Sequence, residues 1–266
     1  MKFARLLPLD IIKKKLQGIR ISAVTAYDVM TAQLADEAHI DIVLVGDSCG
    51  NVVAGYPTTL PVTMDQMIYH CESVVRGSRR ALVVADMPFM SYQESIEQAR
   101  KNAGRLMKET GVAAVKMEIL PSQIDTLRAV VDIGIPVMAH IGFTPQTMFQ
   151  LGGYKIQAKT DGDAQSLVAL AQRVADAGAF SVVLEMIPPA VAAAIRGTIS
   201  IPTIGVGAGP ECDGQILVFH DLVGLSATSP KFAKRYVNLR PEIVDALTRY
   251  RQDIESGQFP GPENSY

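Results

Sequence analysis

An α/β fold, a closed (β/α)8 TIM barrel with an N-terminal helix and a C-terminal helical extension, is predicted by three observations. Short apolar runs rich in Val and Ile recur along the chain, segments of helix length separate them, and no repeat or change in composition interrupts the pattern. Such runs are typical of buried parallel strands. Roughly eight uninterrupted strand and helix units favour a closed barrel over an open sheet. One domain, residues 1–266, is therefore expected.

The expected strands follow one another at similar spacing. They are RISAVTAYD (20–28), DIVLVGDS (41–48), ALVVADMP (81–88), AAVKMEI (113–119), PVMAHIG (136–142), SVVLEMIP (181–188), TIGVGAG (203–209) and the DLVGL region (221–225). The eighth shows the pattern least clearly.

Helix starts are expected where capping residues or prolines precede a helical segment. The signals are Thr63 with Gln66, Ser91 with Glu94, Ser122 with Asp125, and Pro188 with Pro189. In the N-terminal MKFARLLPLDIIKKKLQG, Pro8, Asp10 and three lysines interrupt the apolar residues, so neither a signal sequence nor a membrane span is expected. The segment is predicted to form a short amphipathic helix.

Composition excludes several classes of protein. The formal net charge of -2 leaves no basic surplus for nucleic acid or for an anionic membrane, so a small-molecule partner is expected. Cys49, Cys71 and Cys212 form no CxxC pair, which argues against a disulfide framework and against a zinc cluster. We therefore expect a reduced, cytoplasmic protein.

Polar residues stand at the ends of most predicted strands. They are Asp28, Asp47, Asp86, Glu118, His140 and Glu185. In a parallel barrel these ends gather at one rim, where barrel enzymes build their sites. Strand alternation also puts Lys116 on the same face as Glu118. It puts Asp47 on the same face as Val43 and Val45, and Asp86 on the same face as Val84. Asp47, Asp86 and Glu118 are therefore expected to converge.

Three converging carboxylates repel one another unless they are protonated, paired or bound to a cation, and Lys116 alone does not balance them. Oxygen ligands suit a hard divalent ion, and Mg2+ fits a site that leaves positions for water and substrate. Taken singly, Asp47 and Asp86 could equally be helix caps. Asp28 is expected to be an N-cap. His140 could be a core histidine or could contact a substrate.

Two segments and one turn stay open at this stage. Residues 142–160 contain Gly152 and Gly153 and form either a mobile lid or an ordered surface loop. The C-terminal QFPGPENSY is either a frayed tail or an arm onto a neighbouring subunit. The GVGAG stretch could bind phosphate, although a tight turn that needs glycine explains it better.

The motifs TAYD, LVGDS, GYPTTLPVTMD, ADMPF, VKME, HIGFTPQ, LGGY and GVGAGPECDGQ follow in order along nearly the whole chain. Together they resemble the ketopantoate hydroxymethyltransferase family. The resemblance implies a Mg2+-dependent barrel that transfers a one-carbon unit from 5,10-methylenetetrahydrofolate to 3-methyl-2-oxobutanoate. It also implies a homodecamer of two pentameric rings.

The same resemblance implies roles for individual residues. Asp47, Asp86 and Glu118 would hold the metal, Glu118 either directly or through water. Asp47, Ser48, Asp86, Lys116 and His140 would bind the substrate, and Glu185 would be the base that removes the C3 proton. A Mg2+ chelated by the carboxylate and keto oxygens of the oxo acid would stabilise the resulting enolate.

Two alternatives come from other classes. A Mg2+-dependent 2-oxo-acid lyase of the phosphoenolpyruvate mutase and isocitrate lyase type would use a similar rim, but its Lys-x-Cys-Gly-His loop is absent from the sequence. A ligand-binding barrel without turnover is the other alternative, and Glu185 argues against it only moderately.

Overall fold

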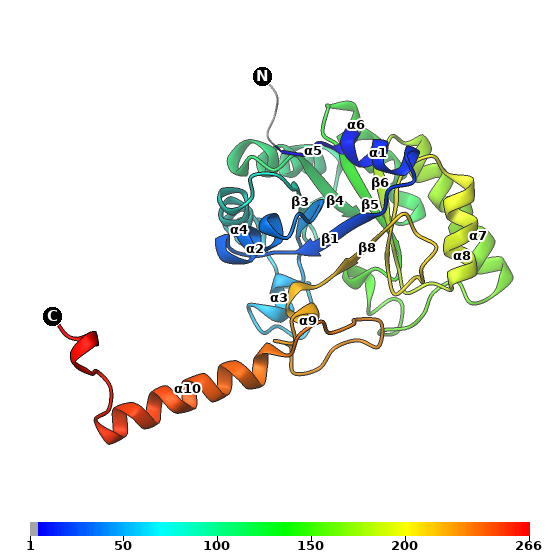
Figure 1. Ribbon diagram of the computed structural model, residues 1–266. Helices are drawn as coiled ribbons and strands as arrows, with labels where there is room; N and C mark the ends of the chain where they lie inside the picture. The colour runs from blue at the N-terminus through cyan, green and yellow to red at the C-terminus, as the bar shows by residue number, and fades with distance from the viewer. Residues whose placement is uncertain (1–4) are drawn as a thin grey trace. The chain divides into compact units, whose positions relative to one another are not determined.

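Eight parallel strands form a closed barrel in the computed structural model, which describes residues 5–266 (Figure 1). Each strand pairs with its neighbour in the sequence, and β1 pairs with β8 to close the ring. The strands are β1 (Ile21–Thr25), β2 (Ile42–Val45), β3 (Leu82–Asp86), β4 (Ala114–Glu118), β5 (Val137–Gly142), β6 (Ser181–Glu185), β7 (Thr203–Val206) and β8 (Gly214–Leu217). The predicted fold class is confirmed.

Helices follow the first six strands and cover the outside of the barrel (Figure 1). They are α2 (Val29–Glu37), α3 (Cys49–Val52), α4 (Met64–Gly77), α5 (Ile96–Arg105) with a π-helical turn (Leu106–Thr110), α6 (Ile124–Asp132), α7 (Asp161–Asp176) and α8 (Pro189–Thr198). Short 3-10 turns, Pro121–Gln123 and Pro145–Thr147, follow β4 and β5. Asp28 caps α2 and Thr63 caps α4 through the predicted box with Gln66.

Three local predictions are wrong. The eighth strand is Gly214–Leu217, whereas the predicted DLVGL region (221–225) starts within a helix, α9 (Phe219–Leu222). The side chain of Ser95, not Ser91, caps α5. Helix α6 begins at Ile124 after a 3-10 turn, so the predicted box of Ser122 with Asp125 is not formed.

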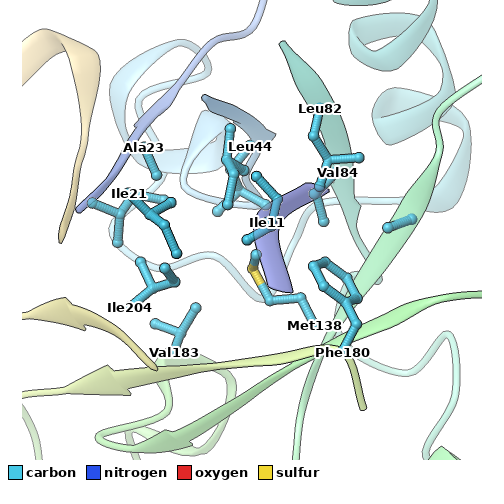
Figure 2. Close-up of a cluster of buried hydrophobic side chains, with 13 residues drawn as sticks. Ile11, Ile21, Ala23, Leu44, Leu82, Val84, Met138, Phe180, Val183 and Ile204 are labelled. Carbon is cyan, nitrogen blue, oxygen red and sulfur yellow. The ribbon is translucent and has the colours of Figure 1, made fainter. Parts of the chain in front are cut away.

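Helix α1 (Pro8–Leu16) closes the N-terminal end of the barrel. Its Lys14 pairs with Asp41 before β2, and its Lys15 donates to the carbonyl of Ile201 before β7. Ile11 is fully buried in the central cluster. Figure 2 shows that side chain among residues from several strands. The cluster consists of Ile11, Ile21, Ala23, Ile42, Leu44, Leu82, Val84, Ala114, Met138, Phe180, Val183, Ile204 and Ile216.

Strand alternation then decides which polar residues face the barrel axis. Val84 and Val183 belong to the central cluster, so Asp86 and Glu185, two residues further on, face the axis as predicted. In β2, however, the cluster takes Ile42 and Leu44. The prediction that Asp47 shares the inward face with Val43 and Val45 is therefore wrong. Asp47 reaches the rim through the turn that follows β2.

Chain contacts divide the protein into two compact units, one ending at Val218 and the other spanning Phe219–Tyr266. Within the second unit, the backbone N–H of Tyr236 donates to the carbonyl of Leu222 of α9. The predicted helical extension is α10 (Leu239–Ser256), followed by a 3-10 turn (Pro262–Asn264). The expectation of a single domain over 1–266 stays a prediction.

None of the helices among residues 5–266 is both long and apolar enough to cross a membrane. The three cysteines, Cys49, Cys71 and Cys212, are free and buried.

Candidate active site

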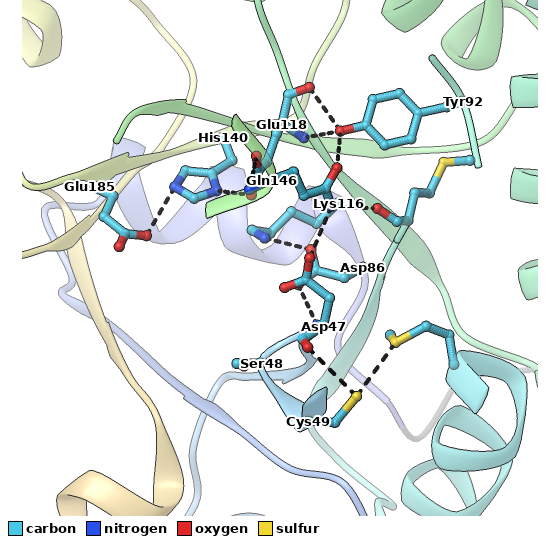
Figure 3. A network of polar contacts seen from close by, with 12 residues as sticks. Asp47, Ser48, Cys49, Asp86, Tyr92, Lys116, Glu118, His140, Gln146 and Glu185 are labelled. Carbon is cyan, nitrogen blue, oxygen red and sulfur yellow. Dashed lines mark hydrogen bonds and ion pairs between the residues drawn. The ribbon is translucent and has the colours of Figure 1, made fainter. Parts of the chain in front are cut away.

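Seven side chains meet at the rim formed by the C-terminal ends of the strands (Figure 3). They are Asp47, Ser48, Asp86, Lys116, Glu118, His140 and Glu185. All except Ser48 and Glu185 are at least nine-tenths buried. The parallel register explains the meeting, because Asp86 pairs with Lys116 and Glu118 with His140 on neighbouring strands. Below them, the same barrel faces carry the apolar cluster.

Asp47 and Asp86 lie on adjacent elements, and Asp86 connects them to Lys116. The Asp47 backbone N–H donates to Asp86 Oδ2 at 3.0 Å, and Lys116 Nζ lies 2.5 Å from Asp86 Oδ1. The turn between β2 and α3 is tight, since a Cβ at Gly46 would lie 2.7 Å from Ser48 Oγ. Ser48 Oγ is in turn 2.9 Å from the Tyr27 hydroxyl. The turn therefore presents a carboxylate and a hydroxyl side by side.

Glu118 and His140 continue the cluster toward β6. His140 Nδ1 lies 3.8 Å from Glu118 Oε1, and His140 Nε2 lies 3.2 Å from Glu185 Oε2. The side chain of Glu185 retains 15% exposure, compared with 4% for the side chain of Glu118. Glu185 therefore has the more accessible carboxylate of the two at this end of the site.

Burial and mutual repulsion shift the pKa values of these groups. Burial and the negative charge of Asp86 raise the pKa of Asp47 to about 7, and burial and Asp47 raise the pKa of Glu118 well above its usual range. Burial would lower the pKa of Lys116, but the negative charges of Asp86, Asp47 and Glu118 together outweigh it and raise that pKa. Four carboxylates, those of Asp47, Asp86, Glu118 and Glu185, thus surround one permanent cation.

Glu185 and His140 shift in opposite directions. Burial raises the pKa of Glu185 to about 8, although the charge of Lys116 opposes this shift. Burial, reinforced by Lys116, lowers the pKa of His140 well below its usual range. The imidazole is therefore neutral at physiological pH, and the carboxylate is a stronger base than in water.

The donor set fits a hard cation in part. Within residues 5–266, no group of three or more His, Cys, Asp or Glu side chains is arranged as a ready metal cluster. Asp47 and Asp86 are adjacent, whereas Glu118 Oε2 accepts a hydrogen bond from the Gln146 backbone. One or two carboxylates, with waters and substrate completing the shell, are how proteins usually hold Mg2+. The surplus of buried carboxylates and the oxygen-only donors suit such an ion.

Sequence reasoning missed Tyr92 and Gln146. The Tyr92 hydroxyl bonds both the backbone N–H and the carbonyl of Glu118, at 3.1 and 3.0 Å. Gln146, in the 3-10 turn after β5, is 5% exposed and donates from Nε2 to Asp47 Oδ2 at 2.9 Å. The only signal was position, since both residues follow predicted strand ends within ADMPFMSY and HIGFTPQ.

The 142–160 segment begins at this buried anchor and then becomes exposed. The rings of Phe143 and Tyr154 pack with centroids 5.1 Å apart, whereas Phe149 is 74% exposed. A cleft of about 400 Å³ lies between residues 156–159 and α7, and none of the rim carboxylates lines it. The predicted lid stays a prediction.

In the GVGAG turn, Gly207 and Gly209 have φ of 64° and 81°, which confirms the need for glycine there.

The family profile described as Ketopantoate hydroxymethyltransferase matches residues 6–262. The chain belongs to this family. A 3-methyl-2-oxobutanoate hydroxymethyltransferase of Geotalea daltonii is 52% identical over 259 residues, which are 97% of each chain. The enzyme of that name in Heliobacterium modesticaldum is 53% identical over 253 residues, 95% of this chain and 92% of the relative.

Several solved structures are also similar to this chain in fold. A 2,3-dimethylmalate lyase of the PEP mutase/isocitrate lyase superfamily matches with a TM-score of 0.61 and 17% identity, over 99% of this chain and 93% of the other. A phosphonopyruvate hydrolase complex with oxalate and Mg2+ matches with a TM-score of 0.60 and 14% identity, over 97% and 93%. At this identity the likeness supports the fold alone, so the family assignment favours the transferase over the lyase alternative.

Proposed function

We propose that this chain transfers a hydroxymethyl group from 5,10-methylenetetrahydrofolate to 3-methyl-2-oxobutanoate, giving ketopantoate. The observation that carries the proposal is the rim cluster: several buried carboxylates around one lysine, in a chain that is about half identical to named transferases over nearly its full length. A site of this charge can hold a cation and an anionic oxo acid together.

Asp47 and Asp86 are the residues that would hold Mg2+, with Glu118 close enough to act through water. When bound there, Mg2+ supplies positive charge to the oxygens of the 2-oxo acid, which makes its C3 proton more acidic. Lys116 and the Ser48 hydroxyl are donors for the substrate carboxylate, because both lie beside this carboxylate pair.

Glu185 is the proposed base. Its raised pKa and its partial exposure suit removal of a proton from a bound molecule. His140, neutral and 3.2 Å away, would orient the Glu185 carboxyl group. Water adds to the methylene carbon of the folate and releases tetrahydrofolate and formaldehyde. The C3 carbanion attacks the formaldehyde carbon, which forms the new carbon–carbon bond, and the proton that Glu185 removed is returned to the resulting alkoxide, which gives the hydroxymethyl group.

A direct assay tests the function. Wild-type protein is incubated with 3-methyl-2-oxobutanoate, Mg2+ and methylenetetrahydrofolate, and ketopantoate is measured. Product that requires the folate identifies the transferase, cleavage of an oxo acid without folate identifies a lyase, and no turnover identifies a binding protein. Undiminished turnover in excess chelator would contradict the metal requirement.

A homodecamer in the cytoplasm completes the proposal. Helix α10 has no buried residue, yet Ile243, Leu247, Tyr250 and Ile254 recur at the spacing of one helix face with 44 to 62% exposure. An apolar stripe of this kind favours a partner surface. The three free thiols suit a reducing compartment. Light scattering at the mass of one 28.7 kDa chain would contradict the assembly.

A further inference from the structure

Gln146 uses every hydrogen-bonding position of its side-chain amide. Nε2 donates to Asp47 Oδ2 at 2.9 Å and to the Met87 carbonyl at 3.0 Å. Oε1 accepts from Gln93 Nε2 at 2.9 Å and lies 3.0 Å from the Tyr92 hydroxyl, whose single proton is shared between this oxygen and the Glu118 carbonyl. An amide has two donors and two acceptor sites, so each of its positions faces a partner.

This pattern fixes which way the amide faces. A flipped amide would set Oε1 against the Met87 carbonyl, which can only accept, and against the Asp47 carboxyl group, which can only accept whenever it is ionised. It would also point the NH2 group at Gln93 Nε2, which is itself a donor. The carboxylate of Asp47 is thus approached by an N–H from one fixed direction.

The backbone of the same residue reaches the second carboxylate. The N–H of Gln146 donates to Glu118 Oε2 at 3.0 Å. Asp47 and Glu118 come from elements 71 positions apart in the chain (118 − 47), and both lie against one residue of the turn after β5. Figure 3 shows Gln146 between them. One oxygen of each carboxylate is engaged by Gln146, and its other oxygen is not.

We propose that Gln146 is a positioning residue that sets the direction and separation of the Asp47 and Glu118 carboxylates for a divalent cation. The inference rests on the proposed function, because the ion is part of it. Buried carboxylates that lack a fixed donor rotate to minimise their repulsion. Groups that hydrogen-bond metal ligands typically change metal affinity by about 10- to 100-fold when they are removed.

The test measures metal affinity directly. Mn2+ stands in for Mg2+, and free Mn2+ is followed by electron paramagnetic resonance during titration of folded wild-type and Gln146→Met proteins. Methionine keeps the length of the side chain and removes both N–H donors. The expected result is a dissociation constant about 10- to 100-fold larger in the variant.

Gln93→Met is the matched control. Gln93 donates to the same amide, but in the part of the chain described no hydrogen bond joins it to either carboxylate. The Mn2+ affinity of the Gln93→Met protein should therefore stay within about twofold of that of wild type. Thermal unfolding without metal is recorded for each protein. Equal loss of stability in both variants with weakened Mn2+ binding only in Gln146→Met supports positioning over a general packing role.

Two results would overturn the inference. One is Mn2+ affinity in folded Gln146→Met within twofold of wild type, and the other is wild-type protein that binds no Mn2+. Should Gln146→Met fail to fold, Gln146→Asn serves, because it keeps an amide one methylene too short to hold Asp47 and Met87 together. Wild-type protein that binds Mn2+ but forms no ketopantoate would contradict the proposed function while the affinity comparison still decides the role of Gln146.

Discussion

His140 Nε2 and Glu185 Oε2 lie 3.2 Å apart at the rim, where burial lowers the pKa of the imidazole and raises that of the carboxyl group. Near neutral pH the histidine is uncharged and Glu185 still carries much of its proton. In the proposed reaction the pair would separate two roles, with Glu185 as the group that exchanges a proton and His140 as a neutral neighbour.

The exchange of the C3 proton of 3-methyl-2-oxobutanoate should accelerate with pH. Glu185 has a pKa of about 8, so its basic form grows as pH rises toward that value. The rate in D2O with Mg2+ is followed by NMR between about pH 6 and pH 9, and it should rise and then level off. Positive charge bound nearby would move the midpoint to lower pH. A rate that falls across this range would contradict the assignment.

Glu185→Gln should slow this exchange by about 10²- to 10⁴-fold, the usual contribution of a general base. Glutamine keeps the shape of the side chain but cannot take up the proton. Mn2+ binding, measured in parallel, should be unchanged, because Glu185 lies outside the carboxylate pair, Asp47 and Asp86, that is proposed to hold the ion. Equal exchange rates in variant and wild type would move the base to another residue, with His140 next by position.

Asp86→Ala should abolish ketopantoate formation and also weaken the fold. Lys116 Nζ, 2.5 Å from Asp86 Oδ1, would lose its nearest counter-charge inside the barrel. Breaking a buried pair costs about 3–5 kcal/mol of unfolding free energy. Urea unfolding measures this loss.

Asp28→Ala is the matched control for that substitution. Asp28 accepts a hydrogen bond from the Thr31 backbone as the cap of α2 and is exposed. Its loss should cost about 1 kcal/mol and leave turnover intact. Equal losses of stability in the two variants would contradict the buried-pair argument.

The barrel should lose the stabilisation that the ionised Asp213 provides when the pH falls into the acid range. Burial alone would raise its pKa, but hydrogen bonds from the Thr203 backbone and from Arg196 lower it overall. A lowered folded-state pKa stabilises the protein above the unfolded value, and that contribution disappears as pH falls through the folded value. In urea unfolding at a series of pH values, Asp213→Asn should therefore differ most from wild type near neutrality. A difference that persists unchanged in strong acid would refute it.

Gly142→Ala should disturb Glu185 through the backbone. Gly142 has φ of 96°, and an added Cβ would lie 2.5 Å from the Glu185 carbonyl oxygen. The strain should cost about 1–3 kcal/mol and slow C3 exchange. Gly134→Ala is the control, since Gly134 has φ of 88° with no atom within 4 Å of the added Cβ. Equal exchange rates in these two variants would argue against the contact.

The inward-facing residues of the site could be predicted from the sequence because strand alternation is local. Asp86, Lys116, Glu118, His140 and Glu185 each sit within an apolar run whose period fixes their face. Asp47 was placed at the rim for the wrong reason, since it lies after β2 ends at Val45, where a turn and not the alternation sets its direction.

The misplaced last strand has a different cause. Gly214–Leu217 is only four residues long, and Gln215 in it is exposed, so it lacks a clear apolar pattern. Its place is fixed by pairing with β7 and β1. Gln146 could not be predicted, because nothing in the sequence marks an uncharged amide in a loop, and its contacts with Asp47 and Glu118 form only in the folded chain.

Ile11 on α1 sits fully buried in the cluster that fills the lower half of the barrel, and the described residues leave that end packed with hydrocarbon. Molecules that bind at the proposed site therefore have to enter from the opposite end of the barrel, at the C-terminal ends of the strands. In the proposed reaction the small oxo acid would bind at the deepest charges, and the bulkier folate would block its way. The two substrates should then bind in a compulsory order, with the oxo acid first and ketopantoate leaving last.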